Sequence, residues 1–225
     1  MRVAPTPTKL INSPPLREHA VLSGIAQIGR LESFYGQTPH RISHREALSL
    51  NGIPVLSGLT ASSSSRKSSA SAAKHGIQHR HESPATLTVS SKRLGDRTWI
   101  SSLERAVLEY AQHVPDIDSD EIIQRCLIFS NSKTFYEVLS ELSSKMKWQD
   151  GIRRLASVSE QLAERSGFCN IVSLENSPSA QHGDHWINLN QREAAIAGST
   201  TEWKDMKYKV CWQTHPDRLY EHLMY

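Results

Sequence analysis

Residues 98–112 read TWISSLERAVLEYAQ, and they mark the point where strand-forming sequence gives way to helix-forming sequence. The β-rich residues at the start predict a short strand over 98–100. Ser101 and Ser102 follow, and serine readily accepts hydrogen bonds from the free N–H groups at the start of a helix. Apolar side chains then recur at helical spacing, at Leu103, Ala106, Val107 and Tyr110. The stretch therefore predicts a strand that leads into a capped amphipathic helix over 102–113.

Charged residues in the same stretch fit structural roles. Glu104 belongs to the first helical turn, where a negative charge offsets the positive end of the helix dipole. Arg105 and Glu109 are four residues apart, a spacing at which opposite charges pair on the surface of a helix. We therefore predict that these three residues organise the fold and take no part in catalysis.

Three further amphipathic segments follow this helix. Pro115 ends the first helix, and apolar periodicity then predicts helices over 120–130, 132–145 and 149–166. Gly167 is placed to close the last one. Four amphipathic helices joined by short loops predict a helical segment.

Two segments near the C-terminus alternate or are rich in aromatic residues, which is typical of strands. They are HWINLN, residues 185–190, and MKYKVCWQ, residues 206–213. We expect them to form a short antiparallel sheet. The fold class predicted for the chain is therefore α+β.

The first half of the chain has weaker signals. Residues 42–52, ISHREALSLNG, predict a short helix that is capped by Ser43, with Glu46 as the capping-box partner and Gly52 at the end. Residues 85–90, ATLTVS, alternate and are β-branched, which predicts a strand. Loosely helical spacing over residues 16–34 predicts one or two short helices.

Low-complexity sequence also occurs in this half. Residues 62–71, SSSSRKSSAS, contain seven serines. They bury too little apolar surface to offset the entropy lost on ordering, so we expect a flexible serine-rich loop at 60–74. The predicted domains are a basic, poorly ordered region over 1–41 and an α+β domain over 42–225.

The net charge of +3 hides an asymmetry between the two halves. Residues 1–95 contain 12 Lys/Arg and 4 Asp/Glu, a net charge of +8, whereas residues 96–225 contain 14 Lys/Arg and 19 Asp/Glu, a net charge of −5. A basic half indicates a surface that faces a polyanion, although a disordered basic tail would produce the same numbers. The candidate phosphate contacts are Arg17, Arg30, Arg41, Arg45, Arg66, Lys67 and Lys74. Such contacts would be sensitive to salt and would not read a base sequence.

The composition argues against a membrane protein and against a disulfide scaffold. No apolar run approaches the roughly 20 residues that a membrane-spanning helix needs, and the N-terminus has no apolar core of signal-peptide length. The three cysteines, Cys126, Cys169 and Cys211, form no CxxC pair. We therefore expect a cytoplasmic protein with free thiols and no membrane partner.

Motifs for enzymatic chemistry are missing from the sequence. No GxSxG, HExxH or phosphate-binding loop occurs. His75 and His79 have a spacing that could bring two imidazoles onto one helix face for a metal, but Gly76 and the serine-rich flank argue against a rigid helix there. We predict a protein that is not an enzyme, with no cofactor and no metal. A hydrolase or nuclease with metal-binding histidines remains an open alternative.

A family resemblance adds to this interpretation. ISSLERAVLEYAQHVPD, residues 100–116, resembles a segment of AbiEi-type antitoxins and related transcriptional regulators that reads roughly Ser-Ser/Thr-Pro-Glu-Arg-Ala-Leu-Leu-Glu. Leu103 stands where the family usually has proline, which aids helix initiation without being required. The matching residues are Ser101, Ser102, Glu104, Arg105, Ala106, Leu108 and Glu109.

Other segments occur in the family's order. Residues 42–53 look like the family's Ser-His-x-x-Ala-Leu-x-x-x-Gly helix, and residues 84–93 are similar to the strand that follows it. Residues 151–167 resemble a later Arg-Arg-Leu-Gly helix, in which Arg153 and Arg154 match and alanine replaces the glycine. The resemblance spans about residues 40–215 and is most specific over 98–113.

The resemblance implies a function. The family starts with a winged helix-turn-helix domain, and GRLESFYG, residues 29–36, stands in the place of its wing, so that 1–41 would be a degenerate form of that domain. Membership implies an antitoxin of a type IV toxin–antitoxin pair that represses its own operon by binding operator DNA. It also implies that the C-terminal domain counteracts a nucleotidyltransferase toxin without a stable complex. The alternative is a non-enzymatic helical interaction module with a disordered basic tail.

Overall fold

The computed structural model is an α+β protein, which confirms the predicted fold class. It describes residues 26–56, 58–65, 67, 69–114, 119–130, 132–165, 184–189, 203–212 and 216. Contacts divide the chain into two compact units, Met1–Ala106 (unit 1) and Val107–Tyr225 (unit 2), so the division falls inside a helix and not near residue 41. No helix in the described part of the chain is long and apolar enough to cross a membrane.

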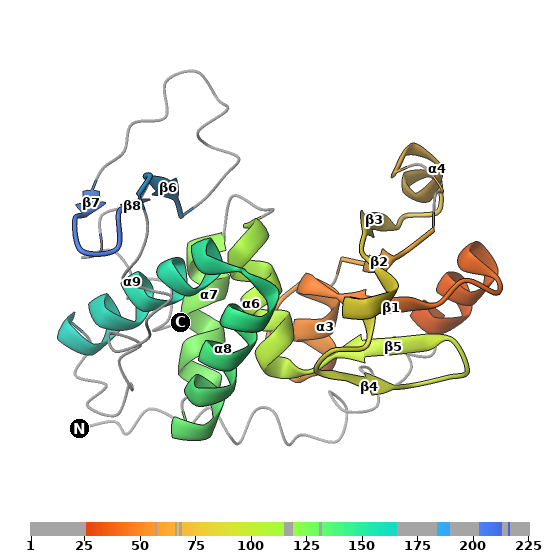
Figure 1. Ribbon diagram of the computed structural model, residues 1–225, viewed down its shortest axis with the longest axis horizontal. Coiled ribbons are helices and arrows are strands. Elements are labelled where there is room, and N and C mark those ends of the chain that lie inside the picture. The colour runs from red at the N-terminus through yellow and green to blue at the C-terminus, as the bar shows by residue number, and fades with distance from the viewer. Residues whose placement is uncertain are drawn as a thin grey trace, which may run out of the picture. The chain divides into compact units, whose positions relative to one another are not determined.

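A five-stranded mixed sheet forms the centre of unit 1 (Figure 1). Its strands are β1 (His40–Ser43), β2 (Thr60–Ser63), β3 (Gln78–His81), β4 (Ser91–Arg93) and β5 (Thr98–Ser101). The order across the sheet is β3-β2-β1-β5-β4. β1 pairs with β2 antiparallel and with β5 parallel, β2 pairs with β3 parallel, and β4 pairs with β5 antiparallel. β3 and β4 are therefore the edge strands.

Short helices surround this sheet. They are a helix over 26–35, α3 (His44–Leu50), α4 (Ser69–Lys74), α5 (Pro84–Leu87) and the first turn of α6 (Leu103–His113). Apolar residues from strands and helices form the core, among them Leu31, Ile42, Leu48, Ala61, Ile77 and Leu87. The helices predicted in 16–34 and 42–52 are confirmed as far as the described residues extend, which excludes 16–25.

Both ends of the serine tract have regular secondary structure, so the predicted loop over 60–74 is wrong there. Its start forms β2, whose residues are all buried, and its end forms α4. β2 lies between β1 and β3, so its backbone is paired on both sides. The serine hydroxyls also find partners: Ser62 Oγ donates to Ser43 Oγ at 3.2 Å, and Ser63 Oγ donates to the Pro39 carbonyl at 3.0 Å. The loop was predicted because serines bury little apolar surface. Small polar side chains nevertheless fit a central strand when their hydroxyl and backbone groups form hydrogen bonds.

Residues 85–90 are also not a strand. Ser83 and Pro84 begin the one-turn helix α5, with proline in the first turn, where its missing N–H costs nothing. The carbonyls of Thr86, Leu87 and Val89 accept hydrogen bonds from two buried arginines. These contacts override the β-preference of the sequence.

The cap of α3 differs from the predicted capping box. Ser43 is the N-cap residue, but its side chain makes no capping hydrogen bond. Both carboxylate oxygens of Glu46 are buried and lack a hydrogen-bond partner among the described residues. The predicted end is confirmed, because Gly52 follows the C-cap residue Asn51 with a φ of 91°, which suits glycine.

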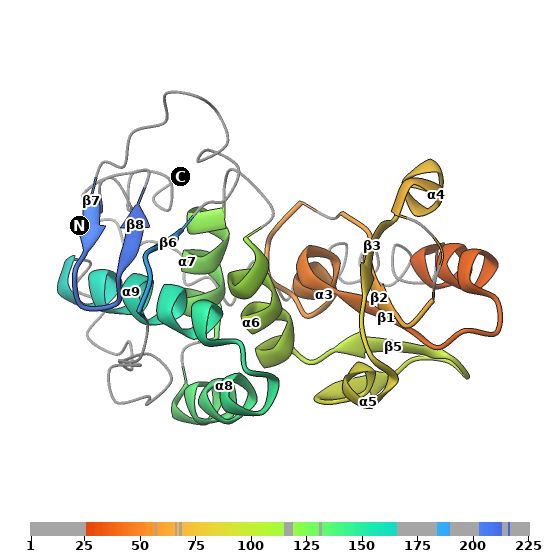
Figure 2. The same cartoon turned by 45° about the horizontal axis from the view of Figure 1, so that its top comes forward.

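Unit 2 begins with the rest of α6 and contains three longer helices. They are α7 (Ser119–Phe129), α8 (Lys133–Met146) and α9 (Gln149–Arg165) (Figure 2). The four-helix segment is therefore confirmed. Ser132 caps α8 by accepting a hydrogen bond from the Phe135 N–H at 3.2 Å. The predicted stop of the last helix at Gly167 lies outside the described residues.

A three-stranded sheet completes the described part of unit 2. Its strands are β6 (Ile187–Asn188), β7 (Trp203–Asp205) and β8 (Val210–Trp212), in the order β6-β8-β7. Each predicted segment contains a strand, but residues 206–209 of the second form a turn, and β7 precedes that segment. The sheet is mixed and not antiparallel, because β6 and β8 run parallel. α9 packs against β8, and Trp212 Nε1 donates to Ser157 Oγ at 3.0 Å.

Candidate functional site

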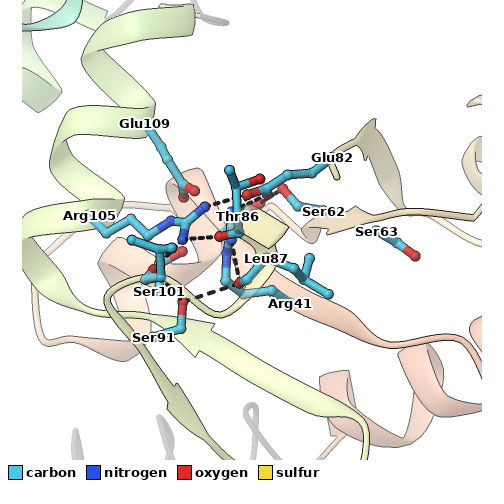
Figure 3. Close-up of polar contacts among 12 residues, drawn as sticks. Arg41, Ser62, Ser63, Glu82, Thr86, Leu87, Ser91, Ser101, Arg105 and Glu109 are labelled. Carbon is cyan, nitrogen blue, oxygen red and sulfur yellow. Dashed lines mark hydrogen bonds and ion pairs between the residues drawn. The ribbon is translucent and has the colours of Figure 1, made fainter. Parts of the chain in front are cut away.

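Arg105, at the centre of the family-like segment, is fully buried in unit 1. Ser102 accepts a hydrogen bond from the Arg105 N–H at 3.3 Å, which confirms the predicted serine cap of α6. The guanidinium extends toward α5 (Figure 3), where Nη1 donates to the Thr86 carbonyl at 2.7 Å and to the Val89 carbonyl. Nη2 donates to Glu82 Oε1 at 2.5 Å.

A second buried arginine, Arg41 of β1, binds the same carboxylate. Its Nη2 lies 2.6 Å from Glu82 Oε2, and its Nη1 lies 3.2 Å from Glu82 Oε1. Nη1 also donates to the Leu87 carbonyl at 2.7 Å. Glu82 directly follows β3, and its side chain is 13% exposed. One carboxylate therefore bridges two guanidiniums from β1 and α6 (Figure 3).

We call Arg41, Glu82 and Arg105 the arginine–glutamate cluster. It fastens β1, α5, α6 and the end of β3 to one another through charge-assisted hydrogen bonds, which are stronger than neutral ones. Glu109, one helical turn further along α6, is only 1% exposed. The predicted surface location of the Arg105 and Glu109 side chains is therefore wrong.

The sequence contains a signal that could have identified Glu82 as the partner of the buried arginines. Glu82 is the only acidic residue between positions 47 and 95, a range with six Lys/Arg. A lone acid in a basic segment is a candidate partner for arginines that are distant in sequence. Arg41 lies 41 residues away and Arg105 lies 23 residues away.

Unit 2 contains a corresponding arginine pair on α9, Arg153 and Arg154. Arg153 Nε donates to the Tyr208 carbonyl at 2.9 Å, and its Nη2 donates to the His185 and Lys209 carbonyls at 2.7 and 3.2 Å. Arg153 Nη1 also lies 3.3 Å from Asp150 Oδ1. These bonds tie the turn between β7 and β8, and the segment before β6, to α9.

Arg154 binds carbonyl groups. Its Nε donates to the Asn188 carbonyl at 2.7 Å, and its Nη1 donates to the Ala111 and Gln112 carbonyls at 2.9 and 3.1 Å. Burial lowers the pKa of Arg154 to about 10, and it also lowers the pKa of Arg153. Arg154 still carries its proton at neutral pH, so carbonyl dipoles stabilise a buried cation. Both family-like arginines are thus structural.

A hydroxyl–imidazole pair occurs at the end of β1. His44 Nδ1 lies 2.9 Å from Ser43 Oγ, and His44 has a φ of 52°. Such a pair is the starting point of many nucleophilic sites. Here Ser43 is 0% exposed and His44 2% exposed, and Ser43 Oγ also contacts the Thr60 carbonyl at 3.4 Å. The arrangement holds the strand-to-helix turn and is closed to a substrate.

The candidate phosphate contacts fall into three groups. Arg17 and Arg66 lie outside the described residues. Arg41 is buried in the arginine–glutamate cluster, so its assignment as a phosphate contact is wrong, and Arg45 is half-buried. The remaining candidates are exposed on unit 1, and they are Arg30, Lys67 and Lys74.

Aromatic and histidine side chains meet at the end of the helix over 26–35. The Tyr35 ring stacks on His40 with centroids 5.0 Å apart, and the Tyr35 hydroxyl lies 2.7 Å from His79 Nδ1. His40 Nδ1 lies 2.9 Å from the Thr38 carbonyl and Nε2 lies 2.9 Å from Thr98 Oγ1. Burial lowers the pKa of both histidines. These contacts connect the helix to β1, β3 and β5.

The described residues contain no group of three or more His, Cys, Asp or Glu side chains placed to hold a metal ion. His79 and His81 lie on the edge strand β3, not on a helix as the metal-site alternative assumed. No family model matches the chain, and comparison with curated proteins and with solved structures likewise finds no match.

Proposed function

We propose that the chain is an antitoxin and transcriptional autoregulator of a type IV toxin–antitoxin pair, acting in the cytoplasm. The observation that supports DNA contact is the surface charge of unit 1. Its exposed basic residues, within the described part, are Arg30, Lys67, Lys74, Lys92, Arg93 and Arg97. Its exposed acidic residues there are only Glu32 and Asp96. Such a surface attracts the phosphate backbone of DNA.

The family resemblance supports the remaining part of the proposal. The residues that carry it are placed as scaffold: Ser102 caps α6, and Arg105 is at the centre of unit 1. In this proposal, unit 2 counteracts a nucleotidyltransferase toxin without forming a stable complex. No residue of the chain is given a catalytic role, and operator DNA is the partner of unit 1.

The test has two independent measurements. In the first, the full chain is titrated onto a labelled duplex from the region upstream of its own gene, at low salt, beside a shuffled duplex of the same composition. Preference for the upstream duplex is expected, and equal affinity for both would contradict autoregulation. In the second, the chain is co-expressed with the nucleotidyltransferase encoded beside it, and growth should recover. Continued growth arrest would contradict the antitoxin role.

The second candidate is a non-enzymatic interaction module. Exposed apolar side chains on unit 2 favour it, since Trp186 is 41% exposed and Met206 is 73% exposed. Exposed tryptophan and methionine are more frequent at protein interfaces than elsewhere on a surface. Under this alternative, the purified chain would show no preference for upstream DNA. Trp186→Ala would weaken capture of a protein partner while leaving the affinity for DNA unchanged.

A further inference from the structure

We propose that the corner between the helix over 26–35 and the turn from α4 to β3 is a binding site for backbone phosphates of double-stranded DNA. Its cations are Arg30 and Lys67, which lie near Phe34 with the imidazole of His75, and Lys74, which precedes His75 in the chain. We call this surface the basic corner. The choice of DNA as the polyanion rests on the proposed function. The new element is the set of exposed basic residues that act together.

Phe34 is the fixed point of the basic corner. Its ring is buried, with 5% of the residue exposed. Lys67 Nζ lies 4.5 Å from the centroid of that ring and also donates to the Phe34 carbonyl. The His75 ring lies 5.1 Å from the Phe34 ring, centroid to centroid. A cation from the loop before α4 and an imidazole from the turn after α4 therefore meet at one aromatic side chain.

Arg30 joins this group from one helical turn before Phe34. A Cβ placed on Gly76 would lie 3.5 Å from Arg30 Nη1, so the guanidinium rests against the turn that contains His75. Gly76 has a φ of 67°, a conformation that favours glycine. The helix over 26–35, the loop before α4 and the turn after α4 thus bring basic side chains to one place. Lys74, the residue before His75, is exposed at the end of α4.

Carboxylates do not neutralise this group. No ion pair joins Arg30, Lys67 or Lys74 to a carboxylate in the described part of the chain. Burial raises the pKa of the Glu46 carboxyl, while the Gly58 backbone and the positive charge of Arg30 act in the opposite direction. Glu46 is itself fully buried, so it does not compete for Arg30 at the surface. The basic corner is therefore available to an external anion.

The chemistry favours the backbone over the bases. Phe34 is buried and offers no face on which a base could stack, and the exposed groups are cations that recognise phosphate. Contacts of this kind release counterions, so the affinity falls steeply with salt, by a slope of about 0.9 per phosphate contact in a log–log plot. The basic corner belongs to one edge of the sheet, because α4 lies beside the edge strand β3 (Figures 1 and 2). Lys92 lies on β4, at the opposite edge of the sheet, and is not part of the corner.

The experiment measures the affinity of the full chain for a labelled DNA duplex of random sequence across a salt series. The double variant Arg30→Gln/Lys67→Gln should lower the salt slope by about 2 and the low-salt affinity by at least about 10-fold. Glutamine removes the charge and keeps a polar side chain, and unchanged thermal unfolding is the check on folding. The matched control Lys133→Gln/Lys145→Gln removes the same charge from two exposed positions on α8 of unit 2 and should change the slope by less than half as much.

Three outcomes would overturn the basic corner. They are an unchanged slope in the Arg30/Lys67 variant, an equal loss in the control, and no binding of the wild-type chain to any duplex. Tighter binding to single-stranded RNA than to the duplex would overturn the choice of DNA. The proposed autoregulation fails separately, if wild-type affinity for upstream and random duplexes is equal while the slope still depends on Arg30 and Lys67.

Discussion

Both units bury a pair of arginines, but they compensate the charges in different ways. In unit 1, Arg41 and Arg105 share the carboxylate of Glu82 in addition to their carbonyl partners. In unit 2, Arg153 and Arg154 bind mainly backbone carbonyls, and Arg153 also lies 3.3 Å from the carboxylate of Asp150. Two cations of unit 1 therefore share one carboxylate, whereas unit 2 distributes the charge mainly over carbonyl dipoles.

The difference has a physical consequence for tolerance to mutation. A buried charge that loses a counter-ion becomes costly, because the low-dielectric interior cannot replace the lost attraction. Losing one carbonyl among several costs about the value of one hydrogen bond. The arginine–glutamate cluster should thus be the more sensitive of the two. The following predictions test this contrast, from the largest expected effect to the smallest.

Glu82→Gln should cause the greatest loss. It removes the charge of the carboxylate that both buried guanidiniums share, and breaking a buried ion pair on one side typically costs about 3–5 kcal/mol. Urea unfolding followed by amide exchange of β1 and β5 measures the effect on unit 1. Glu104→Gln is the matched control, because Glu104 is half-buried in the first turn of α6, outside the cluster. A loss below about 1 kcal/mol for Glu82→Gln would contradict the contrast.

Arg154→Met should cost less, about 1–3 kcal/mol. The substitution removes three hydrogen bonds to carbonyls, but it also removes a buried cation whose pKa burial lowers to about 10. The desolvation cost that disappears offsets part of the loss. Amide exchange of β8 under urea reports on unit 2. A larger loss of stability in unit 2 from Arg154→Met than in unit 1 from Glu82→Gln would contradict the contrast, because the carbonyl-bound arginines would then be the more sensitive pair.

Ser102→Ala should cost about 1 kcal/mol, the usual value of a serine helix cap. Its hydroxyl accepts the Arg105 N–H and also lies 2.8 Å from Ser90 Oγ. Ser132→Ala removes the same kind of cap from α8 and provides the comparison. Thermal unfolding measures both. A much larger cost at Ser102 would mean that the cap also sets the position of Arg105 in the cluster.

The smallest effect concerns pH. The folded pKa values of His40 and His79 lie below the usual 6.5, so the unfolded chain binds protons more readily than the folded chain as the pH falls. Their contribution to stability is present above pH 6.5 and is lost as the pH falls through the folded pKa values. The melting temperature should therefore decrease from pH 7 toward pH 5.

The variant His40→Gln/His79→Gln should flatten that pH dependence. Glu46 acts with the opposite sign, because burial raises its pKa and the folded chain then binds the proton more readily. The comparison is therefore made in a Glu46→Gln background. If the melting temperature depends on pH as steeply in the double variant as in the Glu46→Gln background, groups other than His40 and His79 cause the pH dependence.

Local signals predicted much of the fold. The helices α6 to α9, the Ser102 cap and the two terminal strand segments were all expected, because periodicity and capping act over a few residues. The wrong predictions share another property. The first two residues of the serine tract belong to a central strand because β1 and β3 pair with it on both sides. Residues 84–87 form a helical turn because arginines from two other elements bind their carbonyls.

The candidate site was predicted in part. Charge counting indicated a basic first half, and Arg30 and Lys67 were among the predicted phosphate contacts. Counting could not separate them from Arg41, which has the same charge but is buried. It also could not place His75 beside Phe34, since the two residues are 41 positions apart in the chain.

The sequence by itself determined the α+β class, the four-helix segment and the excess of positive charge in the first half. These properties depend on composition and on neighbours within one or two turns. The tertiary structure decided which arginines are buried, which acid bridges them, and which cations gather on the surface. Those outcomes depend on residues such as Glu82, which meets Arg41 and Arg105 only after the sheet has formed, because burial and counter-ion contact are properties of the packed chain.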